Sequence, residues 1–210
     1  MKPYYQDESV IIYNADCRDV LPTLDTVDLV LTDPPYGIEW SGHVRSARVW
    51  NSMQNDGGDF NLRPILEMQC SVIAFGANNY PEQLPHKGRW ICWDKRTIDG
   101  AADAMLGQPF ELAWSNQTTG FGRMIRVLHG GVVNADGGKR VHPTQKPVAV
   151  MRQLVVWYSE ESQTILDPFM GSGTTLRAAK DLGRKAIGVE IEERYCEIAA
   201  NRMSQLVMQL

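Results

Sequence analysis

One stretch decides the fold: Thr164-Ile165-Leu166-Asp167-Pro168-Phe169-Met170-Gly171-Ser172-Gly173-Thr174-Thr175. It opens with a short apolar run typical of a strand, passes through a glycine-rich turn, and continues into a helical pattern that ends at Gly183. Glycine lets the backbone approach a ligand closely, and the following helix N-terminus presents unpaired N–H groups to a polar or anionic moiety. A strand, a glycine turn and a helix in this order predict the beginning of a βαβ unit.

An acidic residue follows where such a unit holds a nucleoside. Residues 185–190 form a second β-type run that ends in Glu190. The spacing from Gly173 to Glu190 is close to the roughly 20 residues expected between the glycine turn and the acidic residue of a nucleoside-binding unit. A carboxylate there can accept hydrogen bonds from both hydroxyls of a ribose. The absence of a GxxxxGKS/T motif favours a nucleoside without a triphosphate. The alternative is that the glycines only make a tight turn and that Glu190 is a solvated strand end.

A different signal, Asp33-Pro34-Pro35-Tyr36, follows the apolar run 27–32. The two prolines fix φ and prevent a helix from starting, so the Asp33 side chain and the Pro34 carbonyl are held as hydrogen-bond acceptors. Two acceptors suit an NH₂ group and favour its rehybridised form as it attacks an electrophilic methyl group. Tyr36 adds a flat face on which an extruded base can stack. The alternative is an Asp-Pro-Pro turn with a surface tyrosine.

The rest of the chain alternates strand and helix patterns. Seven β-type runs lie at residues 10–13, 27–32, 71–75, 89–93, 110–114, 164–167 and 185–190, and helical patterns follow Pro147, Gly173 and Glu190. This alternation predicts an α/β fold with a doubly wound, mostly parallel, seven-stranded sheet. We expect a single domain over residues 1–210, with loop-like segments at about 37–61 and about 116–141, the first of them mobile.

Composition favours a soluble protein. The 210 residues are 43% hydrophobic and carry a net charge of −4, and no segment approaches the roughly 18 apolar residues of a membrane span. The N-terminus lacks the apolar stretch of a signal peptide, so we expect a cytoplasmic location. The four cysteines are scattered without CxxC spacing, and we expect no metal site.

Basic side chains gather in the two loop-like segments. A polyanion could be bound there, although a solvated basic loop is the alternative interpretation. The candidates are Arg45, Arg48, Arg123, Arg126, Lys139 and Arg140.

Taken together, these motifs resemble an S-adenosylmethionine (AdoMet)-dependent amino-methyltransferase of DNA, of the β-type motif order, in which a tetrad such as Asp33–Tyr36 precedes the cofactor turn. Two further segments carry the resemblance: His142-Pro143-Thr144-Gln145-Lys146-Pro147 and Asn14-Ala15-Asp16-Cys17. The resemblance implies a Rossmann-like, circularly permuted methyltransferase fold. With strands renumbered by the family's scheme, its sheet order 3-2-1-4-5-7-6 would place Asp33 beside Gly171.

The resemblance also implies roles for individual residues. The catalytic set would be Asp33, Pro34, Pro35 and Tyr36, with Asp33 and the Pro34 carbonyl on the target amine. The methionine part of AdoMet would be lined by Asp167, Phe169, Gly171, Ser172 and Gly173, its ribose would be bound by Glu190, and its adenine edge by Asp16. Lys146 is the candidate for the methionine carboxylate, with Thr144 near it.

The implied reaction is direct methyl transfer to the N6 amine of a flipped-out adenine in double-stranded DNA. The resemblance also implies a bacterial or phage-encoded protein and a link to restriction-modification. Asp at the head of the tetrad favours adenine, and cytosine-N4 methylation is the alternative. An alternative of another class is a catalytically silent DNA-binding subunit. Longer relatives carry a larger target-recognition insert than residues 116–141, which predicts a short or degenerate recognition sequence, or a homodimer in which each subunit reads part of the site.

Overall fold

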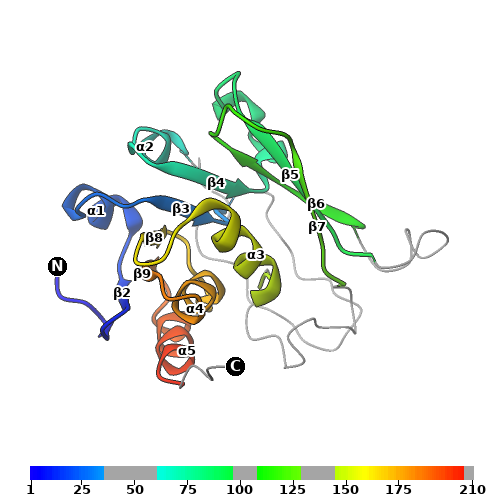
Figure 1. Cartoon of the computed structure of the whole chain (residues 1–210). Helices are drawn as coiled ribbons and strands as arrows, with labels where there is room; N and C mark the ends of the chain where they lie inside the picture. Colours follow the sequence, from blue (N-terminus) through cyan, green and yellow to red (C-terminus); the bar gives the residue numbers. More distant parts are fainter. Residues whose placement is uncertain (36–60, 97–107, 129–144, 206–210) are drawn as a thin grey trace.

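The structure is a computed structural model that describes residues 1–35, 61–96, 108–128 and 145–205 (Figure 1). Its centre is one nine-stranded sheet with the strand order β1-β2-β9-β8-β3-β4-β6-β5-β7. The strands are β1 (Tyr5–Gln6), β2 (Val10–Asn14), β3 (Leu29–Thr32), β4 (Ser71–Phe75), β5 (Arg89–Asp94), β6 (Phe110–Ser115), β7 (Arg123–Arg126), β8 (Thr164–Asp167) and β9 (Lys185–Glu190).

Five α-helices accompany the sheet in the described part of the chain. They are α1 (Cys17–Val20), α2 (Arg63–Leu66), α3 (Val148–Tyr158), α4 (Thr174–Asp181) and α5 (Glu193–Met203), and three short 3-10 turns cover 21–23, 77–79 and 81–83. In these described segments no helix is long and apolar enough to cross a membrane.

The sheet has a parallel part and a mixed part. Strands β2, β9, β8, β3 and β4 pair in parallel, whereas β6 is antiparallel to both β4 and β5. Parallel neighbours require crossover connections, and α4 makes the one between β8 and β9. Because all the parallel strands point the same way, their carboxyl ends form one edge of the sheet, to which the loops that carry the sequence motifs belong.

Alternating side chains give the sheet two apolar faces. Leu29 and Leu31 of β3 belong to the cluster that α3, α4 and α5 cover, whereas Val30, between them, belongs to a second cluster under α2. Figure 1 shows α3, α4 and α5 grouped on one side of the sheet and α1 and α2 beyond its other side. Helices on both faces confirm the expected doubly wound α/β architecture.

All seven expected strands are present, with ends shifted by two residues at most, and their order in the sheet is the order expected. Two strands were missed, β1 and β7. The expectation that residues 116–141 lack regular structure is wrong at β7, which pairs in parallel with β5 and forms the last strand of the sheet. The run Arg-Met-Ile-Arg is too short and too polar to show a strand period, so its pairing with β5 decides its conformation.

Candidate active site

The tetrad and the glycine turn meet at the carboxyl edge of the sheet. Strands β3 and β8 are parallel neighbours, and the hydroxyl of Thr32 at the end of β3 donates a hydrogen bond to Asp167 Oδ1 at the end of β8, at 2.9 Å. From β8 the chain passes through α4 to β9 on one side, whereas β3 is followed by β4 on the other side. The connections that leave the neighbouring strands β8 and β3 therefore run in opposite directions. Such a point is the topological switch point, at which open α/β sheets bind ligands.

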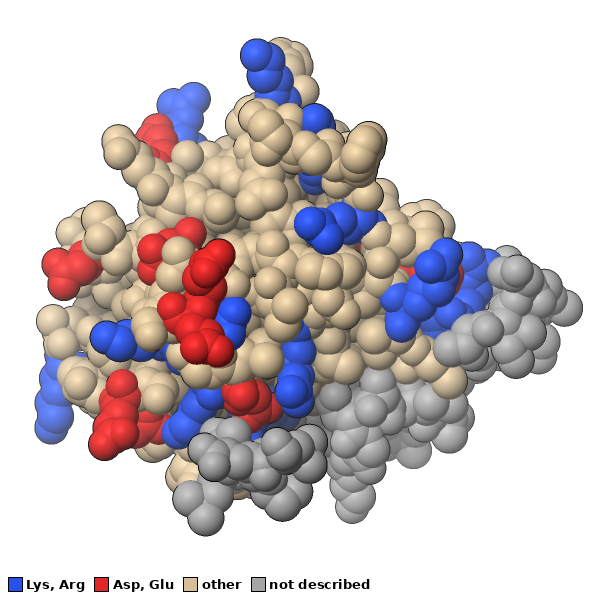
Figure 2. Space-filling model, in the orientation of Figure 1, with Lys and Arg blue, Asp and Glu red and all other residues tan. Residues whose placement is uncertain are grey.

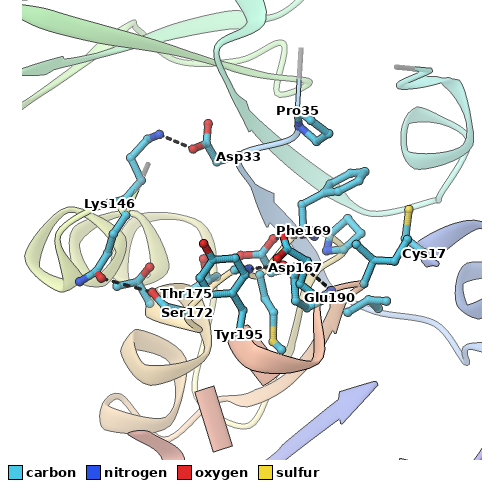
Figure 3. Close-up of a pocket in the computed structure, with 18 of the residues that line it drawn as sticks. Cys17, Asp33, Pro35, Lys146, Asp167, Phe169, Ser172, Thr175, Glu190 and Tyr195 are labelled. Atoms are coloured by element: carbon cyan, nitrogen blue, oxygen red, sulfur yellow. Dashed lines mark hydrogen bonds and ion pairs between the residues drawn. The ribbon is translucent and has the colours of Figure 1, made fainter. Parts of the chain in front are cut away.

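A pocket opens at this switch point (Figure 3). Its cavity of about 130 Å³ is many times the space that one water needs, so it is not a packing defect. The residues around it come from the ends of β8 and β9, from the loops at this edge of the sheet, and from the first turns of α1, α3, α4 and α5. They include Ala15, Asp16, Cys17, Asp33, Pro35, Gln145, Lys146, Asp167, Phe169, Gly171, Ser172, Thr174, Thr175, Glu190, Glu192 and Tyr195.

Two glycines shape the turn between β8 and α4. Gly171 and Gly173 have φ of 49° and 76°, a region that L-residues with a side chain adopt at a cost. A Cβ on Gly173 would also lie 2.9 Å from the Cβ of Ala199 in α5. Gly171 lines the pocket, whereas Gly173 lies outside the lining and packs against α5, so the structure gives Gly173 a packing role.

Glu190 ties the end of β9 to the glycine turn. Its two carboxylate oxygens accept hydrogen bonds from the backbone N–H groups of Gly171, at 3.0 Å, and of Glu192, at 2.8 Å. Burial raises the pKa of Glu190 to about 7, against the lowering effect of these N–H donors. Each oxygen keeps a second lone pair, so the carboxylate can still accept hydrogen bonds from a ligand's hydroxyls.

Asp16 lies beside Glu190 because β2 and β9 are paired in register, with Asn14 opposite Glu190. Its side chain caps α1 by accepting from the Arg18 N–H at 2.9 Å and is also bound by the Arg18 guanidinium, which lowers its pKa. Asp16 is therefore held as a fixed, ionised acceptor on the rim of the pocket.

Asp33 is held by Lys146. The Lys146 ammonium contacts Asp33 Oδ2, and Figure 3 shows the lysine side chain reaching to Asp33 and away from Ser172 of the glycine turn. Oδ1 of Asp33 is buried and has no hydrogen-bond partner among the described residues. Burial raises the pKa of Asp33, and the positive charge of Lys146 opposes that rise.

Two charged residues that sequence reasoning missed extend this pair. Glu111 of β6 lies with Oε2 3.2 Å from Lys146 Nζ, and its other oxygen contacts Lys95, which follows β5. Burial alone would raise the pKa of Glu111, but the two ammonium groups lower it to about 2. Neither residue belongs to a recognisable motif, so no local signal in the sequence could have found them.

The structure brings most of the expected site residues together. Asp16, Asp33, Pro35, Lys146, Asp167, Phe169, Gly171, Ser172 and Glu190 all line the pocket, while Pro34 and Gly173 do not. Arg123 and Arg126 lie on β7. The expected residues Tyr36, Arg45, Arg48, Lys139, Arg140, His142 and Thr144 lie outside the described residues.

Several lining residues were not expected. They come from segments that contain or adjoin the motifs, and they are Cys17, Gln145, Glu192 and Tyr195. Their closeness in sequence to Asp16, Lys146 and Glu190 is the signal that could have predicted their place in the site. Gln145 approaches Ser172, whose hydroxyl lies 3.4 Å from the amide oxygen. In the segments that the structure describes, no group of three or more His, Cys, Asp or Glu side chains is arranged to hold a metal ion.

Comparison with known proteins gives the class of this fold and site. A family of DNA methylases, with N6 or N4 amino specificity, matches residues 106–201. The type II methyltransferase M2.DpnII of Streptococcus pneumoniae is 47% identical over 251 aligned positions, which cover 96% of this chain and 92% of that protein.

Two solved structures share the fold across nearly the whole chain. The PvuII DNA methyltransferase, described as cytosine-N4-specific, superposes with a TM-score of 0.69 at 14% identity, covering 99% of this chain and 91% of that one. The M1.HpyAVI–SAM complex superposes with a TM-score of 0.59 at 22% identity, covering 93% and 100%. The chain belongs to the family of DNA amino-methyltransferases that methylate N6 of adenine or N4 of cytosine.

Proposed function

We propose that this chain transfers a methyl group from AdoMet to the N6 amine of a flipped-out adenine in double-stranded DNA. The observation that carries the proposal is the position of Asp33, which lies at the pocket together with the glycine turn and has an acceptor oxygen without a hydrogen-bond partner in the described structure. The tetrad precedes the cofactor turn in the chain, and we assign the protein to the β-type motif order on that basis.

The residues around the pocket fit the parts of AdoMet, which is the methyl donor of this family and supplies an electrophilic methyl group. Glu190 is a carboxylate with accepting capacity for the ribose hydroxyls, Asp16 is an acceptor for the adenine amine, and Phe169 offers an apolar surface. The start of α4 offers backbone N–H groups to the methionine carboxylate. Because Lys146 is bound by Asp33 and Glu111, we now assign it to the catalytic side of the pocket.

The amine needs help because its lone pair is delocalised into the base. Acceptors on its N–H bonds, from Asp33 and the Pro34 carbonyl, favour the form in which the lone pair points at the methyl carbon. A bond forms between the amine nitrogen and the methyl carbon as the bond from that carbon to sulfur breaks, and the nitrogen then loses a proton. Burial raises the pKa of Asp33 and so makes its carboxylate a stronger proton acceptor, and we assign it that proton.

Cytosine-N4 is the second candidate target, because the same two acceptors suit either amine. The PvuII DNA methyltransferase, which shares the fold and is described as cytosine-N4-specific, is the comparison that supports this candidate. Asp at the head of the tetrad is the feature that favours adenine, by resemblance to the adenine-specific members. Target recognition is assigned to residues 116–141 and 37–61, and the alignment with M2.DpnII is longer than this chain, so that relative carries residues that have no counterpart here.

The test uses the purified full chain with isotopically labelled AdoMet and unmethylated DNA, followed by digestion to nucleosides and mass spectrometry. We expect label in N6-methyldeoxyadenosine. Label in N4-methyldeoxycytidine would replace the assigned base, and no label would overturn the proposed activity. Asp33→Asn, which keeps the size of the side chain, should still bind AdoMet and lose methylation. A rise in melting temperature with AdoMet in both proteins separates an inactive variant from an unfolded one.

A further inference from the structure

Four side chains of alternating charge are linked by successive ion pairs that begin at the pocket: Asp33, Lys146, Glu111 and Lys95. They come from four separate elements, namely the end of β3, the segment before α3, strand β6 and the end of β5. The Lys146 side chain is only 6% exposed, and its ammonium also lies over the Phe75 ring, 5.1 Å from the centroid. A buried ammonium is costly without partners, and here two carboxylates bind it.

The two carboxylates are not equivalent. Asp33 lines the pocket and uses Oδ2 to bind Lys146, which leaves Oδ1 without a hydrogen-bond partner among the described residues. Glu111 is outside the pocket lining and has both oxygens bound, one to Lys146 and one to Lys95. Glu111 thus binds the ammonium from outside the pocket lining, and the ammonium in turn binds one oxygen of the Asp33 carboxylate.

This inference rests on the proposed function. We propose that Lys146 and Glu111 are positioning residues for methyl transfer: Glu111 anchors the Lys146 ammonium on the β6 side, and Lys146 holds one oxygen of Asp33 so that the other stays available to the target amine. Neither residue is required to touch the DNA base or the cofactor.

The ionisation of Asp33 reports on this arrangement. The charged groups that face it are Lys146, Glu111, Lys95 and, across the switch point, Asp167. Burial raises the pKa of Asp33, Lys146 and Lys95 lower it, and Glu111 raises it. Removing Lys146 or Glu111 should therefore move the pKa of Asp33 in opposite directions, which a general loss of stability would not do.

The experiment compares Lys146→Met and Glu111→Gln with the wild-type full chain. Asp33 is titrated by carboxyl NMR, with its signal assigned through Asp33→Asn, and kcat and KM for AdoMet are measured across pH. We expect the pKa of Asp33 to rise in Lys146→Met and to fall in Glu111→Gln. The acid limb of kcat should move the same way, with kcat at neutral pH at least tenfold lower in Lys146→Met and KM for AdoMet changed less than threefold.

A matched control breaks a comparable ion pair elsewhere. Lys180 forms an ion pair with Asp7, which is distant from it in sequence, and 18% of the Lys180 side chain is exposed. Lys180→Met should therefore lower stability and leave the titration of Asp33 unchanged. The conservative variant Lys146→Arg keeps the charge and should restore a large part of kcat.

The inference fails if the pKa of Asp33 does not shift in either variant or shifts in the same direction in both. It also fails if Lys146→Met raises KM for AdoMet far more than it lowers kcat, since that result would return Lys146 to cofactor binding. A wild-type protein that methylates no DNA would overturn the proposed function instead, and the NMR titration would still decide whether Lys146 and Glu111 control Asp33.

Discussion

Thr32 and Asp167, 135 positions apart in the chain, are joined by a hydrogen bond of 2.9 Å across the boundary between β3 and β8. The bond links the strand that carries the Asp-Pro-Pro tetrad to the strand that carries the glycine turn. Asp167 Oδ1 also accepts from the Phe169 N–H at 3.2 Å, so one buried carboxylate fixes both the neighbouring strand and the turn. Burial raises the pKa of Asp167 to about 6 despite these donors.

Replacing Thr32 with Val removes this donor without changing the shape of the side chain much. We expect a loss of about 1–3 kcal/mol in the free energy of unfolding, because a buried carboxylate loses a partner, and weaker AdoMet binding. Denaturant unfolding and calorimetric titration measure the two effects. Thr23→Val is the control, because the Thr23 hydroxyl donates to the Val20 carbonyl in an exposed turn away from the site, and its effect should be under about 1 kcal/mol. Equal losses in both variants would contradict the role given to Thr32.

The raised pKa of Glu190 predicts how stability and AdoMet binding depend on pH. The folded state holds the proton up to about pH 7, whereas the free side chain releases it near 4.5, so this group's contribution to stability declines as pH rises through that window. Hydroxyl donors of a ribose favour the ionised form, so AdoMet affinity should rise over the same window. Glu190→Gln should bind AdoMet poorly and show a smaller fall in melting temperature between pH 5 and pH 8. An unchanged pH dependence in this variant would exclude Glu190 as the titrating group.

Gly173→Ala should destabilise the protein for two reasons, a positive φ and a contact of 2.9 Å with the Ala199 Cβ. Gly183→Ala is the matched control, because its φ is +71° but nothing lies within 4 Å of the added Cβ. We expect about 1 kcal/mol for the control and clearly more for Gly173→Ala. Denaturant unfolding measures both. In an Ala199→Gly background, which lacks the contacting Cβ, the effect of Gly173→Ala should fall to that of the control. An unchanged effect in that background would show that the contact with α5 is not the cause.

The two described arginines of β7 should differ in their effect on DNA binding. Arg126 is 67% exposed, with a weak pair to Asp94 at 3.8 Å, whereas the Arg123 guanidinium lies over the Trp157 ring at 4.7 Å. Figure 2 shows acidic side chains interspersed with Lys and Arg on the left of this face, whereas almost only Lys and Arg are visible on the right, where the β5–β6–β7 end of the sheet lies.

Arg126→Ala should therefore weaken DNA binding and reduce the salt dependence of the affinity by about one phosphate contact, while Arg123→Ala should mainly lower stability. Fluorescence anisotropy with duplex DNA at several salt concentrations measures the first effect. Lys185→Ala is the control, because the exposed Lys185 begins β9 at the edge of the sheet opposite the pocket. Equal weakening by Lys185→Ala would remove Arg126 from the DNA contact.

The sequence was most informative where chemistry is local. The Asp33 tetrad, the glycine turn and Glu190 each follow a short apolar strand, and that pattern predicts both the strand and the loop position of the functional side chain. The order of the central strands followed from the resemblance and is confirmed. Strand β7 was missed because edge pairing with β5, and not its own residues, gives it its conformation.

The ion pairs of Lys146 with Asp33 and Glu111 could not be predicted for a related reason. Ion pairs between side chains on separate elements depend on the packing of the sheet, and they leave no spacing or period in the chain. Lys146 was placed at the cofactor from its motif, but the structure turns its ammonium to Asp33 and Glu111. The sequence pattern likewise predicts that Gly173 lets the backbone approach a ligand. In the structure, the group that leaves no room for a side chain at Gly173 is Ala199 of α5, a helix further along the chain.

The strand order β2-β9-β8-β3 also bears on the synthesis of the protein. Strands β2 and β3 leave the ribosome well before β8 and β9, the two strands that lie between them in the sheet. The sheet can close only when these late strands insert between the early ones, and such pairings between distant segments form slowly. A nascent chain that already carries Asp33 therefore has neither the glycine turn nor Glu190 in place, and the ability to bind cofactor and modify DNA arises only after β8 and β9 have been translated.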